Sequence, residues 1–379
     1  MKDALLWGLA VLLVTGCGER GGSMQRMLPE IPGSNSYATG FEITRAGNTK
    51  MLTVRDPWQR SRDVTFSYLL AGKGESVPDT LSKLPRIDIP VNRVVALSTT
   101  HLAMIETIGQ GRTIRGVSGA DLVYSRTLRD RIRSGEVVDV GYDDGLNYEA
   151  IVSLDPDVLF IYGIGSSARM VSDRLSDLGV PVVFCGEYLE GHPLGKAEWI
   201  RFFACFYGME READRIFHRV DSAYGILCDL ARGVELRPGV LTGLPWNDTW
   251  FMAGGQSFAA RLIRDAGGEY LWSGNPSKEA VPLDLESVFV RAVAAQVWIN
   301  PGSAGSLMEL EATDERFAYL PVVLSGEVYN NNARVRSTGA NDYWESATVR
   351  PDLVLADLIE IFHPRLQTDH HLIYYRKLK

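Results

Sequence analysis

Cysteine and histidine are scarce in this sequence. Its 379 residues include four cysteines and six histidines, and they contain no CxxC pair. A structural zinc site needs several such side chains at close spacing, so we expect no metal centre made of protein ligands. Three thiols lie beside apolar residues, which is typical of buried free cysteines, and three allow at most one disulfide. They are Cys185, Cys205 and Cys228.

Signatures of catalysis and of nucleic-acid binding are also missing. No GxSxG, HExxH or P-loop pattern occurs, so we predict that the protein is not an enzyme and has no cofactor. Its 39 basic residues are outnumbered by 47 acidic ones, which gives a net charge of −8. This balance argues against a general nucleic-acid-binding surface.

Long hydrophobic runs are lacking except at the start of the chain. A charged tip at residues 1–3 is followed by an apolar segment at residues 4–14. That segment is too short to span a bilayer as a helix. It is typical of a secretory signal peptide, which we place at residues 1–16.

The end of this segment resembles the bacterial lipobox, in which small residues precede a cysteine. Here it reads Leu13-Val14-Thr15-Gly16-Cys17. The resemblance implies cleavage before Cys17 and a diacylglycerol on its sulfur, with residues 17–36 as a flexible tether. The protein would then be anchored in the bacterial cell envelope and face the periplasm or the surface. An ordinary signal peptide with a chance cysteine is the alternative.

Alternating patterns divide the rest of the chain into an extension and two similar halves. The content of 45% hydrophobic and 23% charged residues is that of a globular protein. Residues 37–92 alternate apolar and polar side chains around a Gly47-Asn48 turn, which predicts a β-hairpin and a third strand. Residues 93–191 and 236–365 alternate short apolar strands with helices, which predicts α/β lobes with largely parallel sheets.

A long helical pattern separates the two halves. Residues 197–230 contain no proline and predict one continuous helix of about 30 residues, roughly 45 Å long. A rod of this length suits a connection between two domains. We place this connecting helix at residues 192–235 and a polar tail at residues 366–379.

Several segments, in this order and spacing, resemble a class of ABC-importer substrate-binding proteins. That helical-backbone class serves ferric siderophores, haem and cobalamin. The resemblance implies two Rossmann-like α/β lobes joined by a single rigid helix, with the ligand in the cleft between them. It also implies a monomer that delivers its ligand to an ABC permease dimer. The segments span about residues 92–365 and lie at residues 93–98, 146–151, 154–159, 265–268 and 285–288.

The resemblance extends to one acidic residue at the start of a helix in each half. By position, Glu149 and Glu286 match the glutamates with which family members dock on arginines of the permease. The helix dipole alone also favours acids there, so the pattern leaves both explanations open. The segment after the first lobe strand departs from the family, because residues 98–101 read Ser-Thr-Thr-His where proline and a Thr-Glu pair are usual.

Aromatic and polar side chains that follow predicted strands are the candidates for ligand contacts. The carboxyl ends of parallel strands face the binding crevice in such folds, and large planar ligands need aromatic walls with a few polar groups. Each candidate could instead pack within its own lobe or lie on the surface. The candidates are Tyr124, Arg126, Tyr142, Tyr162, Trp246, Trp250, Arg336, Tyr343 and Trp344.

These candidates fit three kinds of ligand. The arginines suit an anionic ferric siderophore, the tryptophans suit bulky cobalamin, and a tyrosine could ligate haem iron. We therefore predict a lipid-anchored protein that captures a ferric siderophore or cobalamin, with haem as the alternative. A surface scaffold or adhesive lipoprotein that acts through residues 37–92 is the alternative from another class.

Overall fold

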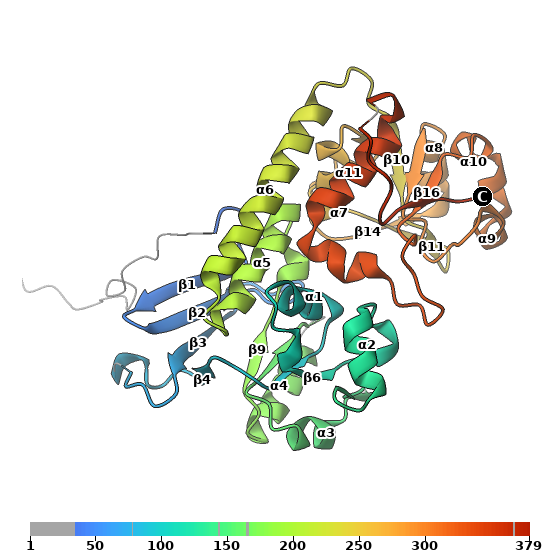
Figure 1. Ribbon diagram of the computed structural model, residues 1–379. Coiled ribbons are helices and arrows are strands. Elements are labelled where there is room, and N and C mark those ends of the chain that lie inside the picture. The colour runs from blue at the N-terminus through green and yellow to red at the C-terminus, as the bar shows by residue number, and fades with distance from the viewer. Residues whose placement is uncertain (1–34, 78, 143–144, 164–166, 367) are drawn as a thin grey trace, which may run out of the picture.

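The computed structural model describes residues 35–77, 79–142, 145–163, 167–366 and 368–379. Within them the chain forms an N-terminal sheet and two α/β lobes, with two helices between the lobes (Figure 1). Cys17, the signal peptide and most of the tether lie outside this part of the chain. None of the helices in the described ranges is both long and apolar enough to cross a bilayer.

The N-terminal sheet has the strand order β1-β2-β3-β4. Gly47, with a φ of 65°, permits the tight turn between the first two strands. The predicted hairpin and third strand are confirmed, and a fourth strand pairs with the third in parallel. The strands are β1 (Phe41–Ala46), β2 (Thr49–Arg55), β3 (Thr65–Gly72) and β4 (Arg86–Ile89).

The N-lobe is built on a five-stranded parallel sheet of order β7-β6-β5-β8-β9. Its central strands are wholly buried, as strands covered on both faces must be. The strands are β5 (Val94–Ala96), β6 (Ile114–Val117), β7 (Val138–Asp139), β8 (Val158–Ile161) and β9 (Val182–Phe184). The helices are α1 (Thr99–Thr107), α2 (Arg126–Arg133), α3 (Tyr148–Ser153) and α4 (Ser167–Asp177).

The C-lobe repeats this plan with the strand order β13-β10-β15-β16-β17. Only β17 (Arg376–Lys377) runs antiparallel in this described sheet, so part of the expected tail at residues 366–379 completes the lobe. The other strands are β10 (Gly239–Thr242), β13 (Glu269–Tyr270), β15 (Val297–Ile299) and β16 (Val328–Asn330). A separate antiparallel sheet contains β11 (Pro245–Trp246), β12 (Thr249–Met252) and β14 (Val281–Asp284). The helices are α7 (Phe258–Asp265), α8 (Leu285–Ala292), α9 (Leu307–Thr313), α10 (Pro321–Leu324) and α11 (Pro351–Phe362).

The connection between the lobes corrects the prediction of one unbroken helix over residues 197–230. The structure has α5 (Pro193–Cys205) and α6 (Glu210–Arg232), separated by a short break. Gly208 has a φ of 66° in that break, a left-handed conformation that cannot continue a right-handed helix. The longer helix, α6, has 23 residues and is therefore about 34 Å long.

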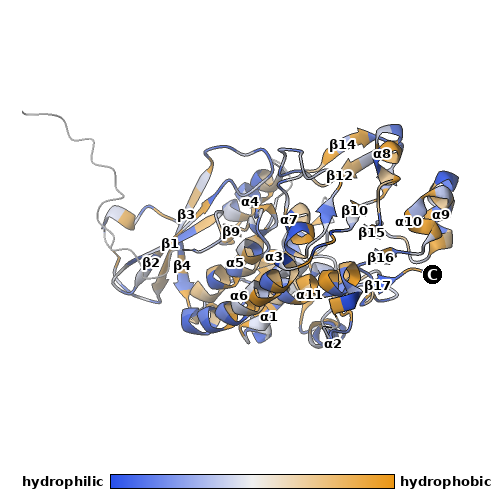
Figure 2. Ribbon diagram, turned by 90° about the horizontal axis from the view of Figure 1, so that it is seen from above, coloured by the Kyte–Doolittle hydropathy of each residue, from blue (hydrophilic) through white to orange (hydrophobic). Residues whose placement is uncertain are grey.

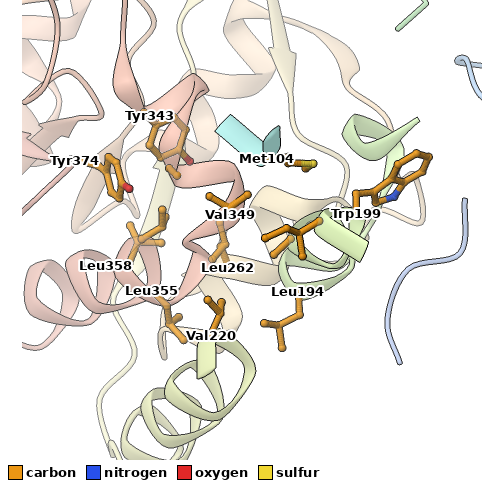
Figure 3. Packing of buried hydrophobic residues seen from close by; sticks show 14 of the residues in the cluster. Met104, Leu194, Trp199, Val220, Leu262, Tyr343, Val349, Leu355, Leu358 and Tyr374 are labelled. Carbon is orange, nitrogen blue, oxygen red and sulfur yellow. The ribbon is translucent and has the colours of Figure 1, made fainter. Parts of the chain in front are cut away.

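One apolar core joins the connecting helices to both lobes. Figure 3 shows Met104 of α1, Leu194 of α5, Val220 of α6 and Leu355 of α11 in the same buried cluster. Apolar residues run along α11, which packs against α6 (Figure 2). The lobes are therefore fixed to a common support, and the site between them depends on how their facing loops meet.

Candidate functional site

A pocket of about 220 Å³ lies where the two lobes meet. Its N-lobe side comes from segments that follow β5, β6, β7 and β8, at the carboxyl end of the parallel sheet. This is the edge at which α/β folds bind ligands. The described lining residues are Leu97, Ser98, Thr99, Ser118, Leu122, Tyr142, Tyr162, Gly339, Asn341 and Trp344.

The C-lobe reaches this pocket through the loop at residues 331–345, which we call the crossing loop. Thr338 Oγ1 donates to the carbonyl oxygen of Asp121 at 2.8 Å, and Arg336 Nε donates to that of Tyr124 at 3.2 Å. From the other side, Thr99 Oγ1 donates to the carbonyl oxygen of Trp344 at 3.0 Å. The lobes are thus hydrogen-bonded to each other around the pocket.

A buried carboxylate completes the contact between the lobes. Glu345, at the end of the crossing loop, is 3% exposed. It accepts hydrogen bonds from the backbone N–H of Tyr124 at 2.7 Å and of Ser125 at 2.8 Å. Burial raises the pKa of Glu345 to about 7, although these two hydrogen bonds act to lower it. The contact therefore contains a carboxyl group that titrates close to neutral pH.

Three of the predicted ligand residues lie together in the pocket. Tyr142 and Tyr162 come from the N-lobe and Trp344 from the crossing loop. Tyr142 and Trp344 are 46% and 58% exposed, so their rings are accessible to a ligand. The pocket thus has aromatic walls from both lobes, as the sequence predicted for its cleft.

Two more candidates lie beside the pocket and hold the lobes together. The Arg336 guanidinium lies 4.5 Å from the centre of the Tyr124 ring, in cation–π geometry.

Two exposed candidates do not line the pocket. Arg126, at the start of α2, is exposed, and its Nε lies 3.9 Å from Asp130 Oδ2. Trp246 is 70% exposed on β11 and is not among the lining residues.

Two of the candidates prove to be core residues, which corrects their prediction as ligand contacts. Trp250 is fully buried, packs on Trp298, and donates from Nε1 to the carbonyl oxygen of Thr242 at 3.0 Å. Tyr343 packs against Tyr375, and burial raises its pKa. Both rings are occupied by their own lobe and cannot meet a ligand in this pocket.

The hydroxyl side chains of the pocket were missed by the sequence reasoning. Ser98 and Thr99 follow β5 directly, and Ser118 follows β6. Their position after a strand was the same signal that singled out Tyr142 and Tyr162. Aromatic rings and charges are the side chains expected to contact large planar or anionic ligands, and small hydroxyl groups at equivalent positions carry no such signal.

The two glutamates occupy equivalent places in the two lobes. Glu149 is exposed in the first turn of α3, and Glu286 lies in the first turn of α8. The Glu286 side chain is 77% exposed, and its Oε1 lies 3.6 Å from Arg316 Nη1. An exposed ion pair of this kind is weak, so both carboxylates are accessible to a partner.

Comparison with known proteins agrees with this architecture. Residues 94–335 match the model of the periplasmic binding protein family. An uncharacterized lipoprotein of Methanocaldococcus jannaschii is 25% identical over 96% of this chain and 94% of its own length. A second uncharacterized lipoprotein of that organism is 27% identical over 81% of this chain and 79% of its own length.

Solved structures share the fold. The periplasmic heme-binding protein RhuT from Roseiflexus sp. RS-1 superposes with a TM-score of 0.56 at 22% identity, over 73% of this chain and 99% of that chain. The periplasmic vitamin B12 binding protein BtuF of Vibrio cholerae superposes with a TM-score of 0.53 at 14% identity, over 74% of this chain and 99% of that chain. The expected fold of two α/β lobes with a helical connection is thereby confirmed.

Proposed function

Because the chain belongs to the family of periplasmic binding proteins, we propose that it captures a ferric siderophore or cobalamin between its lobes and delivers it to an ABC permease. The observation that carries this proposal is a pocket with an aromatic wall from each lobe. Tyr142 and Tyr162 stand on one side and Trp344 on the other. Such a site can hold a planar ligand between the two lobes.

The size of the pocket bears on how such a ligand enters. A volume of about 220 Å³ is below the roughly 300–1,000 Å³ of sites that enclose a drug-sized ligand. A whole chelate therefore requires the crossing loop to move away from the N-lobe. The bond between Thr99 and the Trp344 carbonyl is one of the contacts that has to open.

Haem is the second candidate ligand. Tyr142 and Tyr162 both line the pocket, and a tyrosine oxygen is one of the axial ligands that proteins supply to haem iron. RhuT, which shares the fold, is named for haem binding.

Membrane anchoring through Cys17 is part of the same proposal. Two relatives that match most of this chain are named lipoproteins. A lipidated cysteine followed by a flexible tether would keep the protein in the cell envelope, next to its permease.

Thermal melting in the presence of cyanocobalamin, haemin, ferrichrome or ferric enterobactin tests the ligand assignment. A ligand present at about 100 times its Kd stabilises the protein by roughly 2.7 kcal/mol, which shifts the melting temperature by about 4 °C. Trp344→Ala removes one aromatic wall, so binding of the active probe is expected to weaken about 10- to 100-fold.

The matched control for this substitution is Tyr319→Ala. Tyr319 is also a large exposed C-lobe ring, at 79% exposure, and it does not line the pocket. It is expected to leave the melting shift unchanged. If no probe shifts the melting temperature, the importer proposal fails and a scaffold role for residues 37–92 gains weight.

Reversal of two charges tests docking on the permease. The double substitution Glu149→Arg and Glu286→Arg is expected to leave the ligand-induced melting shift intact. Uptake of the labelled probe by cells that depend on this protein should fall about tenfold or more, because like charges that face each other across an interface cost several kcal/mol. Glu311→Arg, at an exposed acid on α9, is the control. Normal uptake by the double variant would contradict the docking role.

A further inference from the structure

A line of hydrogen-bonded hydroxyl groups leads from the pocket into the core of the N-lobe. Ser98, which lines the pocket, has its Oγ 2.7 Å from Thr100 Oγ1. Thr100 Oγ1 in turn donates to Glu187 Oε1 at 2.7 Å. We call Ser98, Thr100 and Glu187 the hydroxyl relay. None of these residues was among the sequence candidates.

The inner end of the relay is a fully buried carboxylate with a histidine beside it. Glu187 and His101 are 1% and 0% exposed, and His101 Nε2 lies 3.5 Å from Glu187 Oε2. Burial by itself would raise the pKa of Glu187, but His101, Thr100 and Lys196 outweigh it and hold the pKa at about 2. Glu187 is therefore ionised and can only accept hydrogen bonds.

This fixes the direction of every proton in the relay. Thr100 has one hydroxyl proton, which it donates to Glu187. The hydrogen bond between Ser98 and Thr100 must then use the Ser98 proton, so Thr100 is its acceptor. Ser98 Oγ also accepts the Thr100 backbone N–H at 3.3 Å. Counted over the described residues, these bonds leave one lone pair on Ser98 Oγ without a partner and no free hydroxyl proton.

We propose that Ser98 is a specificity-determining residue that acts in the pocket only as a hydrogen-bond acceptor, and that the ligand meets it with an N–H or O–H donor. The inference rests on the proposed function only in taking this pocket as the ligand site. The lining residues in the described ranges carry aromatic rings, hydroxyls and an amide but no charged side chain. The matching ligand group is thus planar, uncharged and equipped with a donor.

The assignment separates the candidate ligands by the chemistry of their edges. A primary carboxamide, such as those around a corrin ring, offers N–H donors and satisfies Ser98. A carboxylate, such as those of haem, and a metal-bound catecholate offer only acceptors. Either of these would face the lone pair of Ser98 without a proton between the two oxygens, which is unfavourable in a partly buried site.

Small aromatic probes test the direction of the relay without knowledge of the natural ligand. Phenol, anisole and benzoate share a ring that fits the pocket, but only phenol carries a donor. Saturation-transfer NMR on the full chain is expected to show phenol binding about tenfold more tightly than anisole, and benzoate not saturating. Thr100→Val frees the Ser98 hydroxyl to turn and donate, so anisole should then bind within about threefold of phenol.

Two further variants make the outcome decisive. Ser98→Ala should remove the preference for phenol. Thr107→Val is the control and should keep the preference for phenol. Thr107 lies in α1, as Thr100 does, but its hydroxyl donates to the Ala103 carbonyl and does not line the pocket. Equal binding of phenol and anisole to the unaltered protein, absence of saturable phenol binding, or an unchanged preference in Thr100→Val would overturn the proposal.

The fragments and the chelates report on different claims. A phenol preference with no chelate-induced melting shift would leave the acceptor role of Ser98 in place and refute the importer ligands. A clear melting shift with one chelate but no phenol preference would support the importer ligands and refute the acceptor role of Ser98.

Discussion

Replacement of Glu198 by alanine is expected to lower the free energy of unfolding by about 3–5 kcal/mol, because it removes one partner from a buried charged network. Glu198 lies on α5 and is 0% exposed. Its carboxylate accepts the backbone N–H groups of Ser36, Tyr37 and Ala38 at 2.9, 2.8 and 2.8 Å and pairs with Arg201. Alanine would leave all of these donors without their acceptor.

Urea denaturation of the variant measures this loss. Glu198→Gln keeps the volume and one acceptor oxygen, so it should lie between the unaltered protein and the alanine variant. Glu311→Ala, at an exposed position, should stay within about 0.5 kcal/mol of the unaltered protein. A loss below about 1 kcal/mol in Glu198→Ala would show that the network adds little.

The reason to expect a large effect is that this network attaches the N-terminal extension to the connecting helices. Glu190 continues it by accepting the backbone N–H groups of Thr39 and Gly40, each at 2.9 Å. Lys50 of β2 donates to the Cys205 carbonyl at 3.0 Å and pairs with Glu210. The extension therefore contacts the end of α5 and the start of α6, on both sides of the break between them.

That same break shows where sequence reasoning on the fold reaches its limit. The short apolar strands and their helices could be predicted, because local periodicity determines them. Gly208 and Gly225 stood in one helical pattern and carried the same local signal. Gly225 stays inside α6, whereas Gly208 takes a positive φ. The difference lies in tertiary contacts, since the Lys50 ammonium from a distant strand satisfies a carbonyl at the helix end.

The candidate site was predictable to a similar extent. Tyr142 and Tyr162 were found because they follow strands, a local feature. Trp250 was predicted to contact the ligand but is buried. The strand β12 alternates buried and exposed residues, with Trp250 and Met252 buried and Phe251 exposed. Tyr343 packs against Tyr374 and Tyr375, whose backbone N–H groups are held by the buried Asp357. No local pattern links residues so far apart in the chain.

The contact between the lobes at Glu345 is expected to strengthen as the pH falls. When the crossing loop is detached, Glu345 is in water and has an ordinary pKa near 4.5; in the closed contact its pKa is about 7. The closed state therefore binds a proton more tightly, and closure takes up a proton between these values. Closure should become more favourable from pH 7 down to about pH 4.5, by on the order of 3 kcal/mol in total.

The groups around Glu345 also favour a raised pKa in the closed contact. Glu106 accepts a hydrogen bond from Ser125 Oγ at 3.1 Å, and its own pKa is raised by burial. Glu106 and Asp342 both act to raise the pKa of Glu345 by charge repulsion. Loss of charge at Glu345 therefore relieves both desolvation and repulsion.

Hydrogen exchange of residues 119–126 measures this closure directly, because the Tyr124 and Ser125 amides are bonded to Glu345. Glu345→Gln is neutral at every pH and keeps one acceptor oxygen, so it can satisfy only one of the two amides, and its protection should not change with pH through titration at this position. The exchange rate in the unaltered protein, divided by the rate in Glu345→Gln, should therefore fall between pH 8 and pH 5. Comparison of the two proteins at each pH cancels the intrinsic pH dependence of exchange.

Glu345→Ala supplies the opposite result. It removes the acceptor altogether, so the amides of residues 124 and 125 should exchange faster at every pH, by roughly 100-fold if about 3 kcal/mol of hydrogen bonding is lost. Protection in the unaltered protein that does not change relative to Glu345→Gln between pH 5 and pH 8 would refute proton-linked closure. If the ratio changes as expected, acidification of the cell envelope would favour the closed state and slow the exchange of ligand.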